Sequence, residues 1–231
     1  MVKKHIPNAV TCANLFSGCI GIVYAFQGQL ETAAHFVLLS GIFDFFDGFA
    51  ARLLNVKSAI GKELDSLADM VSFGFLPGVV MFQLLAQSDY SSPYLPYAGF
   101  IITVFSALRL AKFNIDTRQT EDFIGLNTPM NTLFVVSLPF IRQDYPAVIN
   151  STILLLALTI LLSGLLVSEI RIFSLKFGSS SWQLNKIKYI FLILSALLIV
   201  FLKFVAVPFI LILYIGLSIL HFRQAGKTGY N

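Results

Sequence analysis

Apolar stretches close to the length of a membrane span recur along the whole chain, and this pattern limits the folds open to it. A transmembrane helix needs about 20 mostly apolar residues. The chain is 57% hydrophobic and only 12% charged, which is about half the charge of an ordinary soluble domain. We therefore predict an all-α integral membrane protein, with residues 1–231 forming a single membrane domain. About eight transmembrane helices are expected, at 9–27, 32–54, 66–87, 94–114, 128–141, 147–168, 188–202 and 204–222.

The last two stretches could be read as one helix. Together, however, they are longer than a single span needs. Lys203 and Pro208 interrupt the apolar run between them, and this favours a tight turn between two shorter helices.

Positive charges predict how the helices cross the membrane. With eight spans and the N-terminus in the cytoplasm, most lysines and arginines between spans fall on the cytoplasmic side, and only Arg142 and Lys203 fall outside. Cytoplasmic loops carry such an excess of Lys and Arg. We expect a multi-pass protein of the cell (inner) membrane, with its basic face attracted to anionic membrane lipid. The basic residues are scattered, which argues against a nucleic acid partner.

The first residues, MVKKHIPNAVTCANLF, have the basic-then-apolar order of a signal peptide. Pro7, Asn8 and Asn14 interrupt the apolar part, so we expect this segment to be retained. Cys12 and Cys19 are read as small apolar residues of a helix.

Two pairs of aspartates lie near the inner end of the second apolar stretch and at the start of the third. Asp44 and Asp47 are three positions apart, and Asp65 and Asp69 are four apart. These spacings place both members of a pair on one face of a helix. Four carboxylates meeting at the edge of a bilayer would repel one another, and charge within a membrane is costly. A cation is therefore expected among them, and oxygen ligands suit Mg²⁺, Mn²⁺ or Ca²⁺ better than Zn²⁺.

Small residues accompany these aspartates. Gly48 follows the first pair and Gly61 precedes the second. Glycine in a helix costs about 1 kcal/mol relative to alanine, and it is usually compensated by the close approach of another helix or a ligand. Arg52 lies one helical turn after Gly48, and arginine suits bidentate contact with phosphate. These features predict a metal-dependent diphosphate site. The alternative is a set of interfacial charges paired with Arg52, Lys57 and Lys62.

The same stretch fits the pattern D-x-x-D-G-x-x-A-R-x8-G-x3-D-x3-D at every fixed position. It resembles the signature of the CDP-alcohol phosphatidyltransferases, integral membrane enzymes of phospholipid synthesis. The resemblance implies that Asp44, Asp47, Asp65 and Asp69 bind two divalent cations, Mg²⁺ or Mn²⁺, which hold the diphosphate of a CDP-lipid. It further implies that Asp69 is the general base for the incoming alcohol, and that the enzyme forms a homodimer. The expected CDP-lipid-binding residues are Asn8, Thr11, Asp47, Gly48, Ala51, Arg52 and Gly61.

Three further segments look like the phosphatidylserine synthase branch of that family. After Asp69 the chain reads D-x-V-S-F-G-x-x-P, and LRLAKFN (108–114) and FIGLNTP (123–129) resemble two more elements of the branch. Lys112 stands where arginine is usual, and Asn127 where proline is usual. Since lysine lacks the planar guanidinium fork, a bidentate contact at 112 is in doubt. The resemblance implies CDP-diacylglycerol and L-serine as substrates.

Serine offers a carboxylate and an ammonium group for recognition. Arg109 is the candidate for the carboxylate, Lys112 could assist it, and Asn114 could orient either group. Arg109 could instead be a snorkelling or aspartate-paired residue, and Lys112 a membrane anchor. Glycerol phosphate or inositol phosphate is the alternative acceptor, and either would need a dedicated basic cluster. A cation transporter would more naturally place carboxylates at the bilayer midplane within broken helices.

Overall fold

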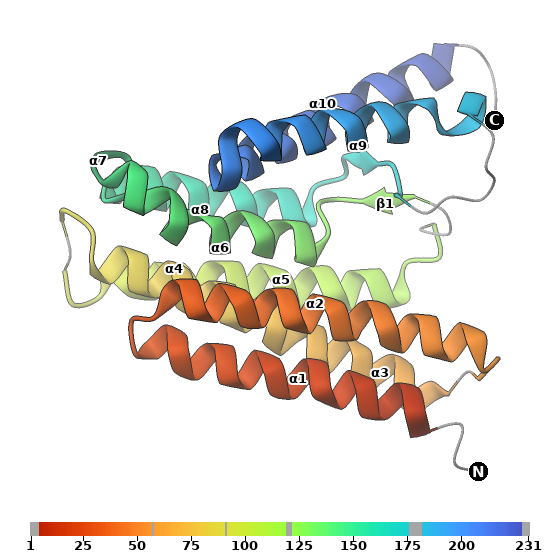
Figure 1. Ribbon diagram of the computed structural model, residues 1–231, viewed down its shortest axis with the longest axis horizontal. Helices are drawn as coiled ribbons and strands as arrows, with labels where there is room; N and C mark the ends of the chain where they lie inside the picture. The colour runs from red at the N-terminus through yellow and green to blue at the C-terminus, as the bar shows by residue number, and fades with distance from the viewer. Residues whose placement is uncertain (1–4, 57, 91, 119–121, 176–181, 228–231) are drawn as a thin grey trace.

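A computed structural model describes residues 5–56, 58–90, 92–118, 122–175 and 182–227. Long helices lie side by side along one direction (Figure 1). A π-helix, η2 (Met70–Phe75), joins α3 to α4 without a break, and 3-10 turns η3 (Leu95–Gly99) and η4 (Lys203–Val205) precede α5 and α10. The α-helices are α1 (His5–Phe26), α2 (Leu30–Leu53), α3 (Ala59–Asp69), α4 (Leu76–Ala86), α5 (Phe100–Ile115), α6 (Thr128–Asp144), α7 (Pro146–Ile149), α8 (Thr152–Val167), α9 (Trp182–Leu202) and α10 (Ala206–Lys227).

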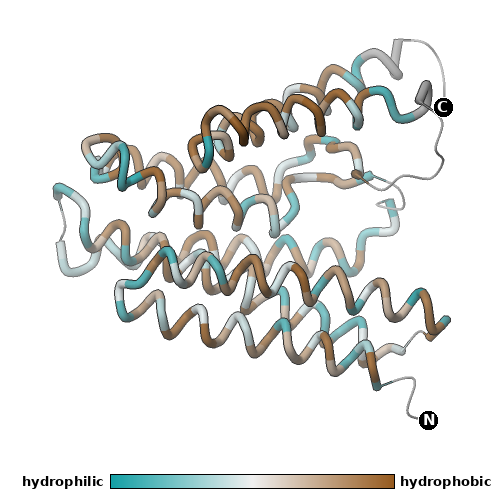
Figure 2. Tube along the Cα trace, in the orientation of Figure 1, coloured by the Kyte–Doolittle hydropathy of each residue, from teal (hydrophilic) through white to brown (hydrophobic). Residues whose placement is uncertain are grey.

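The predicted all-α membrane class is confirmed. Each predicted apolar stretch corresponds to a long helical segment, and the turn expected near Lys203 is η4. Within the described ranges, length and composition alone would allow four segments to cross a membrane. They are His5–Phe26, Ala59–Ala86, Leu95–Ile115 and Asn185–Arg223, of which the last covers most of α9 and of α10. The longest hydrophobic runs lie on α9 and α10 (Figure 2).

Three predicted stretches differ clearly from the observed helices, two of them for a local reason. The third helix begins at Ala59 rather than at 66, because the Ser58 hydroxyl accepts a hydrogen bond from Gly61 N (3.0 Å) and caps the helix start. The stretch 147–168 divides into α7 and α8, where Ser151 caps the second helix. The helix predicted at 188 begins at Trp182.

A pair of short strands was not predicted. β1 (Phe123–Ile124) pairs antiparallel with β2 (Arg171–Ile172), so that Phe123 lies opposite Ile172. Two residues are too few to show the alternation of a strand. The pair connects the segment before α6 to the segment after α8.

Helix α4 lies at the centre of the packing. Most of its side chains are buried, including Leu76, Val79, Val80 and Leu84. Helix α1 packs along α2 and α3, α5 packs on α8, and α9 packs on α10. The start of α1, the end of α2, the start of α3, the end of α5 and β1 all lie at one end of the bundle (Figure 1). The aspartates lie in the helices that meet at this end.

Candidate active site

Three of the four aspartates converge between α2 and α3. Asp44, Asp47 and Asp65 each offer a carboxylate oxygen, and these oxygens lie within 4.8 Å of one another. Asp47 is buried, with 6% of its surface exposed. The three-residue spacing points both α2 carboxylates toward α3, which follows after the short connection 54–58.

This group is suited to a divalent cation. Asp47 Oδ2 is buried without a hydrogen-bond partner in the described part of the chain. An unpartnered buried carboxylate oxygen is costly, and a metal ion would satisfy it. No ion pair joins the four aspartates to a lysine or arginine among the described residues. Lys62 Nζ donates instead to the main-chain oxygen of Asn114 (3.2 Å). Lys57 lies outside the described residues.

Asp69 ends α3, one helical turn beyond Asp65, and is not a member of the close group. Its Oδ1 lies 3.5 Å from Nδ2 of Asn14 on α1. The π-helix η2 begins at the next residue. Asn14 is a neighbour of the site to which the sequence assigned no role, although its segment PNAVTCANLFSG (7–18) resembles the start of the phosphatidylserine synthase branch.

A cavity of about 580 Å³ opens between the start of α1, the end of α2 and the start of α3. Six of the seven residues expected to bind the CDP-lipid line it: Asn8, Thr11, Asp47, Gly48, Ala51 and Gly61. The seventh, Arg52, is exposed and does not line it. The other polar residues that line it are Asp44, Ser58, Lys62 and Asp65.

The two glycines of the motif have different surroundings. A Cβ on Gly61 would lie 2.7 Å from Ser58 Oγ and 3.0 Å from Asn8 Oδ1, so this glycine allows α1 to approach α3. A Cβ on Gly48 would meet no atom of another residue within 4 Å, and Gly48 lines the cavity. The absence of a side chain at 48 therefore leaves room in the cavity rather than between helices.

A second cavity, of about 190 Å³, adjoins the first, since Asp65 lines both. Asp69, Arg109 and Asn114 also line it. Arg109 is 3% exposed, its Nε donates to the main-chain oxygen of Leu126 (3.2 Å), and its guanidinium lies 5.2 Å from the centre of the Phe113 ring. Asn114 Nδ2 donates to Ser66 Oγ (2.8 Å). The other lining residues are Ser66, Leu110, Phe113, Phe123, Asn127, Thr128 and Pro129.

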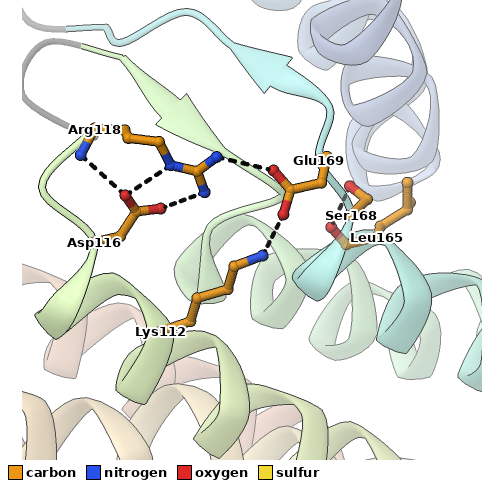
Figure 3. A network of polar contacts seen from close by, with 6 residues as sticks. All are labelled: Lys112, Asp116, Arg118, Leu165, Ser168 and Glu169. Carbon is orange, nitrogen blue, oxygen red and sulfur yellow. Dashed lines mark hydrogen bonds and ion pairs between the residues drawn. The ribbon is translucent and has the colours of Figure 1, made fainter.

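Lys112 is not brought to this cavity. Its ammonium pairs with Glu169, which follows α8, and Arg118 Nη1 lies 3.6 Å from the other oxygen of the same carboxylate (Figure 3). Arg118 also makes a two-point contact with Asp116 (3.0 and 2.9 Å). The hydrogen bond and positive charge of Lys112 hold the pKa of Glu169 below its usual value.

Asn127 caps helix α6. Its Oδ1 accepts a hydrogen bond from Met130 N (2.9 Å), as asparagine often does at a helix start. Helix capping thus explains the asparagine at position 127, where proline is usual in the branch. Asn127 also lines the second cavity.

Comparisons with known proteins agree with this geometry. The family model described as CDP-alcohol phosphatidyltransferase matches residues 4–163. The chain is 34% identical over 200 residues to the CDP-diacylglycerol–serine O-phosphatidyltransferase of Helicobacter pylori, covering 85% of this chain and 81% of that protein. It is 33% identical over 172 residues to the protein of the same name from Bacillus subtilis, covering 73% and 89%. It is 27% identical over 159 residues to the archaetidylserine synthase of Methanothermobacter thermautotrophicus, covering 68% and 66%.

Since the family model covers more than half of the sequence, and since the aspartates of its motif gather at two adjoining cavities, the chain belongs to the CDP-alcohol phosphatidyltransferase family.

Proposed function

We propose that this protein transfers a phosphatidyl group from CDP-diacylglycerol to L-serine, forming phosphatidylserine and releasing CMP. The observation that carries the proposal is the pair of cavities that share Asp65. The larger one is lined by six of the seven residues expected to bind the CDP-lipid, and the smaller one by Asp69 and the buried Arg109. The names of the similar proteins from Helicobacter pylori and Bacillus subtilis support serine as the acceptor.

Asp44, Asp47 and Asp65 would hold a divalent cation, and Asp69 would complete the ligands for a second. Mg²⁺ or Mn²⁺ suits these oxygen ligands. When bound, such ions neutralise the diphosphate and make its phosphorus more open to attack.

The chain's own residues would bind and orient the two substrates. The cavity space beside Gly48 and the polar side chains of Asn8 and Thr11 would receive the cytidine diphosphate. Asp69 would accept the proton of the serine hydroxyl. The serine oxygen would then form a bond to the lipid-side phosphorus, and the bond from that phosphorus to the oxygen of CMP would break. General bases of this kind contribute about 10²–10⁴-fold in rate.

Arg109 would bind the serine carboxylate. A buried guanidinium held by the Leu126 carbonyl and stacked near Phe113 is pre-oriented for a carboxylate. Asn114, whose side chain is fixed by Ser66, would contact a second polar group of serine.

The site would face the cytoplasm. Lys62 lines the larger cavity, Lys112 is in the last turn of α5, and Arg171 is in β2, which pairs with β1. The end of α5 and β1 lie at the same end of the bundle as the site, whereas Arg142 is in the last turn of α6, which ends at the opposite end (Figure 1). The positive-inside rule assigns the basic end to the cytoplasm. Residence in the cell (inner) membrane and a homodimer remain predictions of the sequence.

A phosphate-bearing acceptor is less well suited to the smaller cavity. Arg109 is the one cationic side chain among the described residues that line it, whereas glycerol phosphate or inositol phosphate adds two negative charges. A cation transporter is also disfavoured, because the aspartates lie in α2 and in the segment from α3 to α4, both of which run without a break, rather than in broken helices.

The test is CMP release by purified protein with CDP-diacylglycerol, Mn²⁺ or Mg²⁺, and a panel of alcohols. We expect release that depends on serine. Release with glycerol phosphate or inositol phosphate, and none with serine, would reject serine as the acceptor.

A further inference from the structure

Asn14 on α1 contacts both helices that carry the aspartates. It is fully buried, at 0% exposure. Its main-chain oxygen accepts hydrogen bonds from the hydroxyl of Ser40 (3.2 Å) and from that of Ser72 (3.1 Å). Ser40 precedes Asp44 by one turn of α2, and Ser72 follows Asp69 by three residues in η2. The backbone of Asn14 is thereby tied to both aspartate-bearing segments.

A glycine on α1 permits this contact. A Cβ on Gly18, one turn after Asn14, would overlap the hydroxyl of Ser72. The V-S-F-G run after Asp69 therefore has a structural role, since its serine anchors the π-helix to α1. The hydrogen bonds to the Asn14 main chain leave its side-chain amide available for Asp69.

The amide of Asn14 has one oriented contact. Nδ2 lies 3.5 Å from Asp69 Oδ1, and Oδ1 of Asn14 is buried with no hydrogen-bond partner among the described residues. The Nδ2 contact is at the long end of the hydrogen-bond range, and such contacts at active sites shorten when substrate binds. Asp69 precedes a π-helix, a feature found frequently at functional sites.

We propose that Asn14 is a positioning residue for Asp69. Nδ2 of Asn14 holds Oδ1 of the Asp69 carboxylate, so that Oδ2 of that carboxylate is available to the serine hydroxyl. This inference rests on the proposed function, in which Asp69 is the general base. Asn14 itself touches neither substrate. Its contribution is the orientation of the base, and a misplacement of about 1 Å in such a group can cost about 10²-fold in rate.

The test compares Asn14→Leu, which keeps the branched shape of the side chain and removes the amide, with Asn14→Gln, which keeps an amide. Serine-dependent CMP release gives kcat and the KM of both substrates, and the electron paramagnetic resonance signal of free Mn²⁺ gives metal affinity. We expect Asn14→Leu to lower kcat about 10²-fold with KM and Mn²⁺ affinity close to wild type, and Asn14→Gln to recover part of kcat. The matched control is Ser17→Ala. It removes the hydrogen bond from the Ser17 hydroxyl to the main-chain oxygen of Phe36 (3.0 Å), which joins α1 to α2 and does not involve Asp69.

A kcat of Asn14→Leu close to wild type would overturn the inference. A fall in kcat accompanied by an equal fall in Mn²⁺ affinity would also overturn it, since that pattern indicates a purely structural role. If Asn14→Leu does not fold, Asn14→Ala is measured by the same criteria. Failure of the proposed function is recognised separately, because wild-type protein would then release no CMP in response to serine.

Discussion

Lys112, near the end of α5, donates a hydrogen bond from Nζ to Glu169, two residues beyond the end of α8. Glu169 lies just before β2, whose partner β1 includes Phe123, a residue of the smaller cavity. The ion pair therefore helps to hold the wall of the proposed acceptor cavity in place. Lys112 acts on that wall from outside rather than on the acceptor.

The stability contributed by Glu169 should depend on pH. Lys112 lowers the pKa of this carboxyl. A carboxyl whose pKa is lower in the folded state stabilises the fold above its unfolded pKa, and the stabilisation is lost as the pH falls through the folded value. We expect wild type to unfold at a higher temperature than Glu169→Gln. The difference between the two unfolding temperatures should be constant from neutral pH down to about pH 5, and should disappear as the pH falls below the usual pKa of glutamate, about 4.3. The difference should be small, because exposed ion pairs contribute little. A difference that persists unchanged at the lowest pH would contradict the pairing.

Gly48→Ala should separate folding from substrate binding. An added Cβ meets no atom of another residue within 4 Å and points into the larger cavity. Since alanine is favoured over glycine in a helix by about 1 kcal/mol, the unfolding temperature should stay the same or rise. The KM for CDP-diacylglycerol should increase while the KM for serine does not. Gly41→Ala, on the same helix and also without a neighbour within 4 Å, is the control and should leave the KM for CDP-diacylglycerol unchanged. An unchanged KM in Gly48→Ala would mean that the nucleotide does not occupy this space.

The helices and the aspartate group could be predicted because they depend on local patterns. Apolar stretches mark the helices, and the three- and four-residue spacings put Asp44 with Asp47 and Asp65 with Asp69 on common faces. The predicted interaction partners of two basic residues were less accurate. Arg52 was assigned from its place one helical turn after Gly48 and from the motif, and Lys112 from the LRLAKFN segment. Arg52 is exposed and does not line the larger cavity, and Lys112 pairs with Glu169.

Contacts between distant segments could not be derived from sequence spacing. Asn14 and Asp69 are 55 positions apart. The β1–β2 pair joins Phe123 to Ile172, 49 positions apart, and Ile124 to Arg171, 47 positions apart. Neither α1 nor the two-residue strands carry a periodic signal for these contacts. The family model ends at residue 163. Glu169 and β2, which support the smaller cavity, therefore lie beyond the residues that the family model matches.

Arg109→Lys should weaken serine binding specifically. Lysine keeps the positive charge but loses the fork that can bind a carboxylate at two points. The loss of one charge-assisted hydrogen bond, about 1.5–3 kcal/mol, corresponds to an increase in the KM for serine of about ten-fold or more. Kinetics at varied serine and saturating CDP-diacylglycerol measure this effect. Lys112→Gln should raise the KM for serine less, because Lys112 pairs with Glu169 outside the cavity. The opposite order of the two variants would transfer carboxylate binding to Lys112.

Asp69→Asn should abolish turnover while sparing the binding of CDP-diacylglycerol. The amide cannot accept the serine proton, so kcat should fall by about 10²–10⁴-fold, while the close group of Asp44, Asp47 and Asp65 remains intact. Asp47→Asn should lose both turnover and binding, because it removes a charge from that group. Single-turnover CMP release and equilibrium binding of a labelled CDP-lipid measure the two effects. Glu63→Gln is the control, since it removes a carboxylate charge from the exposed side of α3. Near-normal turnover by Asp69→Asn would show that another group accepts the proton.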